Sequence, residues 1–552
     1  MDDIEALPDR IFDNYYNTTI FITGGTGFLG KRSTGGTGFL GKVIIERLLR
    51  VFDVKKIYIL IRDRKGQIPS ARLQNLFSSP LFDKVRSLKG AEIFEKCKAI
   101  AGEVAKDHLG LNDEDREILQ KEVEYVIHSA ATVRFDEPLR KAILINTKGA
   151  VSMIGLAKEM ANLKLFIHVS TAYCHPEENV LKETTYRAKY NYEHMISLAN
   201  WFDEGTLESV RSGFMAGIPN TYTFSKALGE DAVASVMDTL PIVIMRPTII
   251  TPIWKEPLPG WTDNVNGIVG MFLAFGKGIL RTMPAEPNIA LDLITVDVVI
   301  VGMFLAFGKG ILRTMPAEPN IALDLITVDV VADNILALGA YSLQNGMPSR
   351  VFNISSHNYF SERCIVFFEK CKQIITERAP FETFLWIPSI TLTNSKFVYY
   401  FLVVICQLLP SLIIDRLLPL FGHKPFLWRT QMRILDSLNI LQYYLENTWT
   451  FENHCIAKCE AWMNAKEFHK YTLTHYGIDL NEYLIQLFLG TKRYILKEPD
   501  VILPKTKRLM RIMVWANQIL GIILKLFVSY FFYRMVLLRI FNYIVRFCVK
   551  NI

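Results

Sequence analysis

The amino-acid sequence predicts an α/β protein with a doubly wound parallel sheet, followed by a mainly helical domain and a hydrophobic C-terminal segment. Over the first half of the chain, short apolar runs alternate with helical patterns, which is typical of a parallel sheet. A glycine-rich turn follows the first apolar run. Beyond about residue 360 the pattern becomes helical, and two long apolar stretches appear there. These three observations predict the fold class.

The predicted sheet is built from six apolar runs, and helical patterns such as Lys141–Met160 lie between them. The segment His175–Asn220 is long and more polar, and it exceeds the length of a simple connection. We therefore expect it to form part of a lid or substrate cap. The candidate strands are Thr18–Thr23, Lys56–Ile61, Lys98–Ala101, Tyr125–His128, Leu165–Ser170 and Pro241–Arg246.

The composition limits the possible partners. At 552 residues the chain is long enough for two or more domains, and its hydrophobic fraction of 50% favours membrane contact. The net charge of +7 is spread along the chain without a basic arm, so we expect no nucleic-acid partner. Eight cysteines do not make a disulfide framework, and the N-terminal residues lack the pattern of a secretory signal. His454, Cys455 and Cys459 have no second ligand pair, so we expect no metal site.

Two stretches of the sequence are duplicated, within 23–42 and 268–331. TGGTGFLGK begins at Thr23 and again at Thr34, and a 32-residue stretch, Ile268–Val299, recurs unchanged at Ile300–Val331. We interpret both as recent duplications or gene-model errors and expect the surplus copies to be looped out, because a packed core has no room for them. We favour the first glycine copy as the phosphate loop, because FLGKRS before the second copy would make a poor buried strand.

The glycine motif predicts a dinucleotide site of the Rossmann type. Gly24, Gly27 and Gly30 permit a tight turn, close approach to a pyrophosphate and close helix–strand packing. The following helix presents free N–H groups to the phosphates. The residues expected to bind the cofactor here are Thr23, Gly24, Thr26, Gly27, Phe28 and Gly30.

Residues after two other strands complete the predicted cofactor site. Arg62 stands where an NAD site usually has an acidic residue, so its guanidinium favours a 2′-phosphate and therefore NADPH. The alternative is that Arg62 lies in a solvated charged loop with no role in cofactor binding. Ala130 and Ala131 follow the fourth strand, and their small side chains let the cofactor lie over the edge of the sheet. Asn146 either supports this backbone or is a hydrogen-bonded core residue.

A tyrosine and a lysine are the candidate catalytic pair. Tyr222 and Lys226 lie one turn apart on one face of a predicted helix. The lysine ammonium would lower the pKa of the phenol and hold the nicotinamide ribose, so that Tyr222 donates a proton to a carbonyl as hydride arrives. Ser170 and Thr171, at the end of another strand, offer hydroxyls that orient the carbonyl.

Two apolar stretches are candidate membrane segments. Phe397–Ile414 carries no charge, and Ile512–Tyr533 carries only Lys525. Each is able to span a bilayer or to lie as an apolar hairpin or interfacial helix, and a buried core helix is the alternative. Pro410 and the shorter length weaken the membrane interpretation of the first stretch. Basic residues on both sides of the second give no orientation.

Several motifs together resemble known families. TGGTGFLG, HSAATVRFDE, NTKGA, HVSTAYC, YTFSK and IMRPTII resemble the extended short-chain dehydrogenase/reductase group. GWTDNVNG from Gly260, GKGILR from Gly276, DLITVD from Asp292 and the tail from about residue 365 to 490, including NTWTF from Asn447, resemble alcohol-forming fatty acyl-CoA reductases. The resemblance covers nearly the whole chain.

This resemblance implies two NADPH-dependent reductions, from fatty acyl-CoA to aldehyde and then to a primary alcohol. By motif position, Tyr222 is the proton donor, Lys226 its partner, and Thr171 or Ser170 the hydroxyl group. We expect an NADPH-binding reductase domain at 1–360, a helical domain at 361–500 and a membrane-anchoring tail at 501–552. The anchored enzyme is expected on the endoplasmic reticulum or peroxisome, with its catalytic domain facing the cytosol.

Other functions compete with this one. An extended reductase acting on another lipid or a steroid carbonyl is disfavoured by GWTDNVNG and the C-terminal domain. A carboxylic acid reductase is disfavoured because nothing in the sequence would activate a free acid with ATP. An inactive, scaffold-like membrane-bound homologue is disfavoured by the intact Tyr222 and Lys226 pair, whereas the duplications favour it.

Overall fold

The structure is a computed structural model of the chain, and part of the sequence lies outside its described residues. It describes residues 2–25, 38–63, 68–262, 281–282, 313–314, 325–347, 349–356, 364–382, 387, 395–422, 424–429, 431–432, 435, 443–444, 447, 449–534 and 539–540.

A seven-stranded parallel sheet forms the centre of the fold, in the order β12-β7-β5-β4-β1-β2-β3. The predicted fold class is confirmed, and each of the six predicted strands is present to within one residue at either end. The seventh strand, β12, was not predicted. The strands are β1 (Thr19–Thr23), β2 (Lys56–Ile61), β3 (Cys97–Ala101), β4 (Tyr125–His128), β5 (Leu165–Val169), β7 (Ile242–Pro247) and β12 (Val351–Ile354).

The strand order places a ligand crevice next to β1. The chain runs outward from β1 through β2 to β3, and then returns to the other side of β1 as β4. In doubly wound sheets, ligands bind at the carboxyl ends of the strands where the order reverses in this way. The turns after β1 and β4 therefore border the expected cofactor site.

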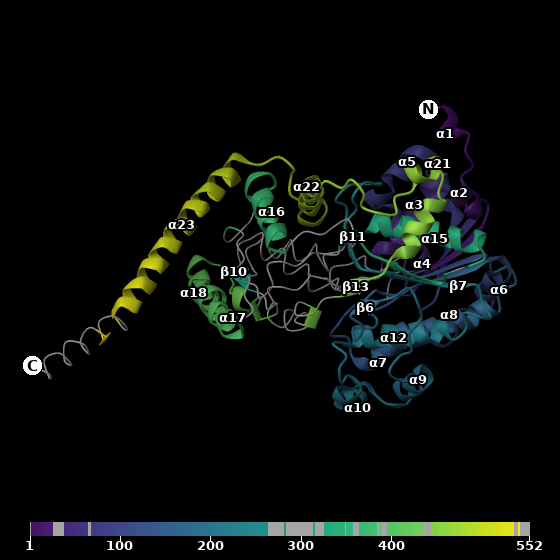
Figure 1. Cartoon of the computed structure of the whole chain (residues 1–552), viewed down its shortest axis with the longest axis horizontal. Coiled ribbons are helices and arrows are strands. Elements are labelled where there is room, and N and C mark those ends of the chain that lie inside the picture. The colour runs from purple at the N-terminus through teal and green to yellow at the C-terminus, as the bar shows by residue number, and fades with distance from the viewer. Residues whose placement is uncertain are drawn as a thin grey trace, which may run out of the picture.

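Helices cover both faces of the sheet, as Figure 1 shows. Along β1 the side chains alternate: Ile20 and Ile22 belong to one hydrophobic core, and Phe21 belongs to the core on the opposite face. The first core is covered by α2 (Arg10–Tyr15), α3 (Phe39–Val51) and α15 (Val328–Gln344). The second is covered by α6 (Asp113–Glu122), α8 (Gly149–Lys158) and the end of α12 (Thr221–Ala234).

The long segment after residue 175 folds against the catalytic helix. It contains β6 (Val180–Leu181) and three helices, α9 (Tyr192–Trp201), α10 (Glu204–Ser209) and α11 (Arg211–Phe214). Met195 and Leu207 share a small hydrophobic cluster with Phe224 and Leu228 of α12. This packing places the segment beside the site, and its role as a lid or substrate cap stays a prediction.

The C-terminal half is mainly helical, and part of it belongs to the core of the sheet. The helices are α16 (Cys364–Glu377), α17 (Lys396–Val403), α18 (Leu409–Leu417), α20 (His454–Trp462), α21 (Ala465–Lys470), α22 (Leu480–Gly490) and α23 (Pro504–Phe532). Cys455, Ile456 and Cys459 of α20 are buried in the same core as α3 and α15. An ion pair of 2.5 Å between Arg10 and Glu467 also joins α21 to the N-terminus.

Residues from both copies of each duplication belong to the described fold, and the looping-out of the surplus copies stays a prediction. Strand β1 leads into the first glycine copy, whereas α3 begins with residues of the second, so the described part of the turn draws on both copies. In the 32-residue repeat, the second copy supplies β11 (Leu325–Thr327), which pairs with β8 (Ile249–Thr251) and continues into α15. At equivalent positions of the two copies, β9 (Arg281–Thr282) and β10 (Arg313–Thr314) pair with each other.

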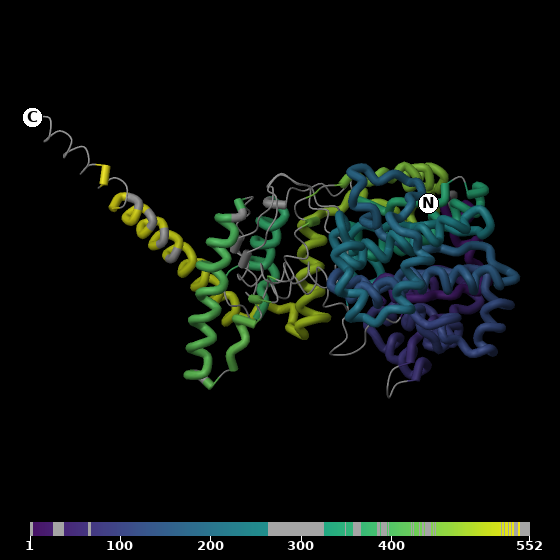
Figure 2. Tube along the Cα trace, turned by 90° about the horizontal axis from the view of Figure 1, so that it is seen from below, coloured from purple at the N-terminus to yellow at the C-terminus, as the bar shows by residue number. Residues whose placement is uncertain are grey.

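Among the described residues, two helices have the length and composition needed to cross a membrane: Phe397–Leu420, with 24 residues, and Pro504–Phe531, with 28. In the structure α23 extends away from the rest of the protein, as Figures 1 and 2 show from perpendicular directions. Its apolar side chains Ile519, Ile523 and Phe527 are each more than half exposed. Length and exposure agree with membrane association.

Candidate active site

The turn after β1 is in direct contact with the turn after β4. Gly24 has φ +83°, a conformation that side chains other than glycine rarely adopt. A Cβ at this position would lie 2.7 Å from the Ser129 hydroxyl oxygen and 2.9 Å from the Ala130 nitrogen. Ser129 donates a hydrogen bond of 2.8 Å to the carbonyl oxygen of Thr23. Only glycine fits this close approach, as a cofactor turn requires.

The helix that follows the turn begins in the second glycine copy. A Cβ on Gly41 would lie 2.7 Å from the carbonyl oxygen of Gly24, so the first turn of α3 lies directly against the end of β1. Gly41 therefore makes a helix–strand contact of the kind predicted for Gly30. This glycine cradle fits a dinucleotide. Four of the predicted cofactor residues lie outside the described residues: Thr26, Gly27, Phe28 and Gly30.

Thr23 also binds the end of β4 through its side chain. Its hydroxyl lies 2.7 Å from Nδ1 of His128 and accepts a hydrogen bond of 3.3 Å from the Ala130 N–H. Burial, together with the positive charge of Lys226, lowers the pKa of His128 to about 3, so its ring is neutral. The small side chains of Ala130 and Ala131 follow at this edge, as the sequence predicts.

Asn146 is a fully hydrogen-bonded core residue that also supports this edge, so both interpretations of it hold. It lies in a π-helical turn, Ile143–Lys148, a feature common at functional sites. Its side chain accepts a hydrogen bond from the Thr132 N–H at 2.8 Å and donates to the Thr132 carbonyl at 3.0 Å. It also donates to the Ser225 hydroxyl at 2.9 Å, so it connects the segment after β4 to α12.

The predicted catalytic pair lies near the start of α12. The side chain of Asn220 caps this helix by accepting a hydrogen bond of 2.9 Å from the Thr223 N–H. Tyr222 and Lys226 are both buried. The Lys226 ammonium donates a hydrogen bond of 2.8 Å to the carbonyl of Val169, the last residue of β5. Lys226 is thereby fixed beside the segment that carries the predicted hydroxyls.

Those hydroxyls belong to Ser170 and Thr171. The Ser170 hydroxyl is buried and has no hydrogen-bond partner among the described residues, so it is open to a ligand. The Thr171 hydroxyl accepts a hydrogen bond of 3.3 Å from the Tyr173 N–H. Across the site, the ring of Tyr222 stacks on Phe135 with 5.7 Å between ring centres. The structure thus brings Lys226 together with the predicted hydroxyl segment, beside the cofactor edge.

A buried ionic network lies behind Lys226, and our sequence analysis did not identify it. Glu230, one turn after Lys226, pairs with Arg246 of β7 at 2.5 Å, and neither side chain is exposed. Polar atoms of Cys174, His175 and Glu230 lie within 4.8 Å of one another, a grouping with metal-ligand chemistry. Because the Glu230 carboxylate is already bound to a guanidinium, a metal ion would meet a fixed positive charge there. The sequence signal that could have indicated this network is the spacing of Glu230, four residues after Lys226 on the same helix.

Arg62 lies at the carboxyl end of β2, where a cofactor ribose is expected. Its side chain is 51% exposed, and its guanidinium lies 3.6 Å from Glu103. Arg72 of α4 (Pro69–Phe77) donates a hydrogen bond to the Arg62 carbonyl oxygen, which places a second guanidinium near this end of β2. The sequence analysis missed Arg72 because only the tertiary structure brings it here.

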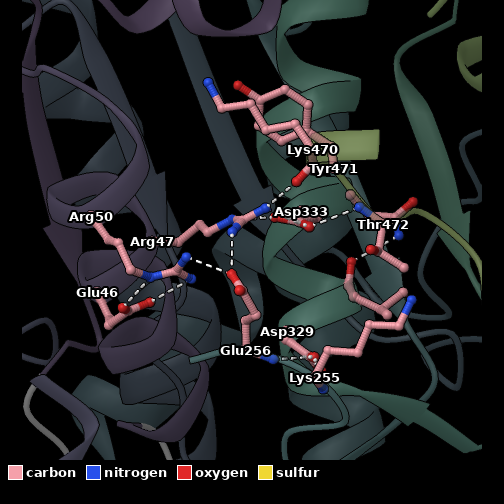
Figure 3. A network of polar contacts seen from close by, with 12 residues as sticks. Glu46, Arg47, Arg50, Lys255, Glu256, Asp329, Asp333, Lys470, Tyr471 and Thr472 are labelled. Carbon is pink, nitrogen blue, oxygen red and sulfur yellow. Dashed lines mark hydrogen bonds and ion pairs between the residues drawn. The ribbon is translucent and has the colours of Figure 1, made fainter. Parts of the chain in front are cut away.

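A cavity of about 910 Å³ lies elsewhere, between α3, α15 and the segment after α21. Figure 3 shows charged residues of its lining, several of which pair with one another. Arg47 binds Asp333 at 2.7 Å, and Arg50 binds Glu256 at 2.6 Å. Asp333 also accepts a hydrogen bond of 2.9 Å from the Thr472 N–H. None of the predicted catalytic residues lines this cavity, so we interpret it as a polar junction between the sheet and the C-terminal segment.

Comparison with known proteins agrees with the site geometry. An NAD-binding family model described as male sterility protein matches residues 34–303, and a second model with the same description matches 406–498. Fatty acyl-CoA reductase 1 of Mus musculus is 32% identical over 499 residues, covering 90% of this chain and 88% of the relative. Fatty acyl-CoA reductase wat of Drosophila melanogaster is 31% identical over 526 residues, covering 92% and 90%.

Solved structures support the fold. The reductase (R) domain of a nonribosomal peptide synthetase from Mycobacterium tuberculosis has a TM-score of 0.53 at 16% identity, covering 90% of this chain and 98% of that chain. The terminal R domain from the myxalamid PKS-NRPS pathway has a TM-score of 0.51 at 15% identity, with the same coverage. The NAD-binding match and the glycine turn identify an oxidoreductase that uses a nicotinamide cofactor. Because relatives above 30% identity align along about nine-tenths of both chains, this chain belongs to the fatty acyl-CoA reductase family.

Proposed function

We propose that this chain reduces long-chain fatty acyl-CoA to a primary fatty alcohol through an aldehyde, with NADPH as the cofactor. The observation that carries the proposal is the Tyr222 and Lys226 pair. It is buried beside the cofactor edge, with Lys226 fixed to Val169 at 2.8 Å and the Ser170 hydroxyl open to a ligand. Relatives named fatty acyl-CoA reductase supply the substrate class.

The cofactor would lie across the carboxyl ends of β1, β2 and β4. Thr23, Gly24, Ala130 and Ala131 border its path, and the first turn of α3 faces it with free N–H groups. When bound, the cofactor supplies hydride to the substrate carbonyl carbon. Arg62 would bind a 2′-phosphate, which supports NADPH over NADH.

The side chains of this chain manage the proton and the carbonyl. Tyr222 donates a proton to the carbonyl oxygen as it gains negative charge, and the Lys226 ammonium favours this by stabilising the phenolate. The Ser170 or Thr171 hydroxyl orients the carbonyl. In the first reduction the carbon–sulfur bond of the thioester breaks and coenzyme A leaves as a thiol. In the second, the aldehyde accepts a hydride and a proton to become the alcohol.

The apolar helices would attach the enzyme to its substrate's environment. Fatty alcohols and acyl chains partition into bilayers, so an anchored enzyme meets them at the surface. The proposed organisation is a reductase domain at 1–360, a helical domain at 361–500 and an anchoring tail at 501–552. We further propose that the sheet domain faces the cytosol from the endoplasmic reticulum or peroxisome, because NADPH and reduced thiols are found in the cytosol.

Substitution Tyr222→Phe tests this function, because it removes only the phenolic hydroxyl. We expect alcohol production from acyl-CoA to fall about 100- to 10,000-fold, while NADPH binding, followed by its fluorescence, is retained. Tyr16→Phe, at an exposed tyrosine, is the matched control and should keep full activity. Near-normal alcohol production by Tyr222→Phe would contradict the assigned proton donor. If the unsubstituted chain binds NADPH but reduces no acyl-CoA, the scaffold-like alternative is favoured.

A further inference from the structure

A short segment of the C-terminal half lies against both catalytic elements of the sheet domain. We call Tyr444, Trp449 and Phe451 the aromatic clamp; all three side chains are buried. Trp449 and Phe451 belong to the NTWTF motif, to which the proposed chemistry assigns no role. The contacts of the aromatic clamp show what this motif does.

The hydroxyl of Tyr444 binds the beginning of the catalytic helix. It accepts a hydrogen bond of 2.7 Å from the Asn220 side-chain amide and shares another of 2.8 Å with the Thr223 hydroxyl. Asn220 is the N-cap of α12, and Thr223 follows Tyr222 directly. A residue 224 positions from Asn220 along the chain therefore fixes the turn of α12 that carries Tyr222.

The ring of Tyr444 also restrains the Tyr222 ring through one intermediary. Its centre lies 5.4 Å from the ring of Phe135, which in turn stacks on Tyr222 at 5.7 Å and an interplanar angle of 20°. Tyr444 thus contacts both the backbone turn that carries Tyr222 and the ring that stacks on it. No contact of Tyr444 with the reacting atoms is needed for this restraint.

The other two clamp residues hold the hydroxyl segment. The indole N–H of Trp449 donates a hydrogen bond of 3.0 Å to the Pro176 carbonyl. Trp449 and Phe451 contact the ring of Tyr173 edge-on, with 5.9 and 5.2 Å between ring centres. Tyr173 is the residue whose N–H binds the Thr171 hydroxyl. In addition, β13 (Thr450–Phe451) pairs in parallel with β6.

We propose that Tyr444 is a positioning residue for proton transfer, through which the C-terminal half sets the position of Tyr222 relative to the hydroxyl segment. This inference rests on the proposed function, in which Tyr222 donates the proton. Proton transfer requires donor and acceptor within hydrogen-bond reach, and a displacement of about 1 Å in an active site costs on the order of 100-fold in rate. The C-terminal half is therefore part of the catalytic unit.

The test is Tyr444→Phe in the full-length protein, which keeps the ring and removes the two hydrogen bonds. We expect kcat for fatty aldehyde reduction to fall about tenfold, while KM for the aldehyde and NADPH affinity change less than about twofold. The solvent deuterium isotope effect on kcat should rise, because proton transfer becomes more rate-limiting. A residue with only a structural role would not change this isotope effect.

Tyr125→Phe is the matched control. Tyr125 is also buried, and its hydroxyl donates one hydrogen bond of 2.9 Å to Asn14 near the opposite end of the strands. The Tyr125→Phe variant should lose some thermal stability and keep the kcat and the solvent isotope effect of the unsubstituted protein. The inference would be overturned if Tyr444→Phe behaves like this control and keeps kcat. It would also be overturned if kcat falls while the isotope effect stays unchanged. If Tyr222→Phe itself remains active, the proton donor is wrong and the inference falls with it, so the two failures are distinguishable.

Discussion

The protonation of Lys226 predicts that activity and stability respond in opposite directions to alkaline pH. Burial lowers the pKa of Lys226 to about 8, and the Glu230 carboxylate limits this decrease. The ammonium is the form that stabilises the Tyr222 phenolate. As the pH rises through about 8, Lys226 loses its proton and the rate of the reductive step should fall. One unit above the pKa, about one-tenth of the activity should remain.

The stability of the protein should change in the opposite direction. An unfolded lysine has a pKa of about 10.4, so between about pH 8 and 10.4 the unfolded state binds more protons than the folded state. The free energy of unfolding therefore rises with pH in this window. The cost of the buried charge is fully present below pH 8 and amounts to about 3 kcal/mol, from about 1.4 kcal/mol per pKa unit. A loss of activity in this window is thus separable from unfolding.

Several groups around Lys226 keep one protonation state across this window. Arg246 on β7 stays charged beside Glu230, whose pKa is held well below its usual value by Arg246 and His175. Burial lowers the pKa of His175, but Cys174 and the carboxylates of Glu177 and Glu230 outweigh it and raise this pKa to about 12, so the ring stays protonated. Burial keeps the pKa of His168 well below neutrality, as it does that of His128 on β4. These groups therefore do not contribute to the predicted loss of activity at alkaline pH.

The assay is a single-turnover reduction of a fatty aldehyde by the NADPH-loaded enzyme between pH 6.5 and 10, followed by NADPH absorbance. Urea unfolding at each pH measures stability in parallel. Glu230→Gln should move the fall in rate at alkaline pH to a lower pH, because it removes the carboxylate that favours the ammonium form of Lys226. Circular dichroism must show this variant folded, since it leaves Arg246 without its charge partner. A rate that stays constant to pH 10, or that falls only where the protein unfolds, would refute the reasoning.

Four further predictions follow from other parts of the structure. Arg62→Asp should weaken NADPH use and narrow the preference over NADH; equal cofactor kinetics in parent and variant would contradict this role. Arg47→Met leaves the buried Asp333 carboxylate without its charge partner and should lower the free energy of unfolding, measured with a chemical denaturant, by about 3–5 kcal/mol. A decrease below about 1 kcal/mol would show that solvent screens this ion pair. Deleting residues 26–36, which yields the same chain as removing either glycine copy, should leave the melting temperature unchanged or higher; a large decrease would show that the extra residues are integrated. The intact chain should stay in the membrane fraction during carbonate extraction, and truncation before Pro504 should weaken this attachment. Finding the intact chain wholly in the soluble fraction would disprove the anchor.

Much of the fold was predictable because it depends on short-range patterns. Six apolar runs gave six strands, and the spacing of Tyr222 and Lys226 placed both on one helix face. The strand β12 was missed because Asn353 interrupts its apolar run, and the carbonyl oxygens of Leu181 and Glu452 that bind this buried side chain are supplied only by the tertiary structure. The predicted boundary at residue 360 did not anticipate that α20 is buried in the core of the sheet, because an apolar helix face does not indicate which surface covers it.

The duplications show where a sequence is ambiguous in principle. Identical copies have identical local propensities, so no pattern within them distinguishes one from the other. The structure separates them by chain connection, since the second copies continue directly into α3 and α15. Gly41, in the second copy, makes a helix–strand contact of the kind predicted for Gly30, which lies outside the described residues.

The sequence by itself determined the fold class, the cofactor turn and the residue types of the catalytic pair, because these depend on periods of two or 3.6 residues and on fixed spacings. The tertiary structure alone decided what each of those side chains meets. The Val169 carbonyl for Lys226, Arg246 for Glu230 and the Tyr444 hydroxyl at the start of α12 all come from distant parts of the chain. Such contacts leave no periodic signal, because they arise where separate elements cross after each has folded against the shared core.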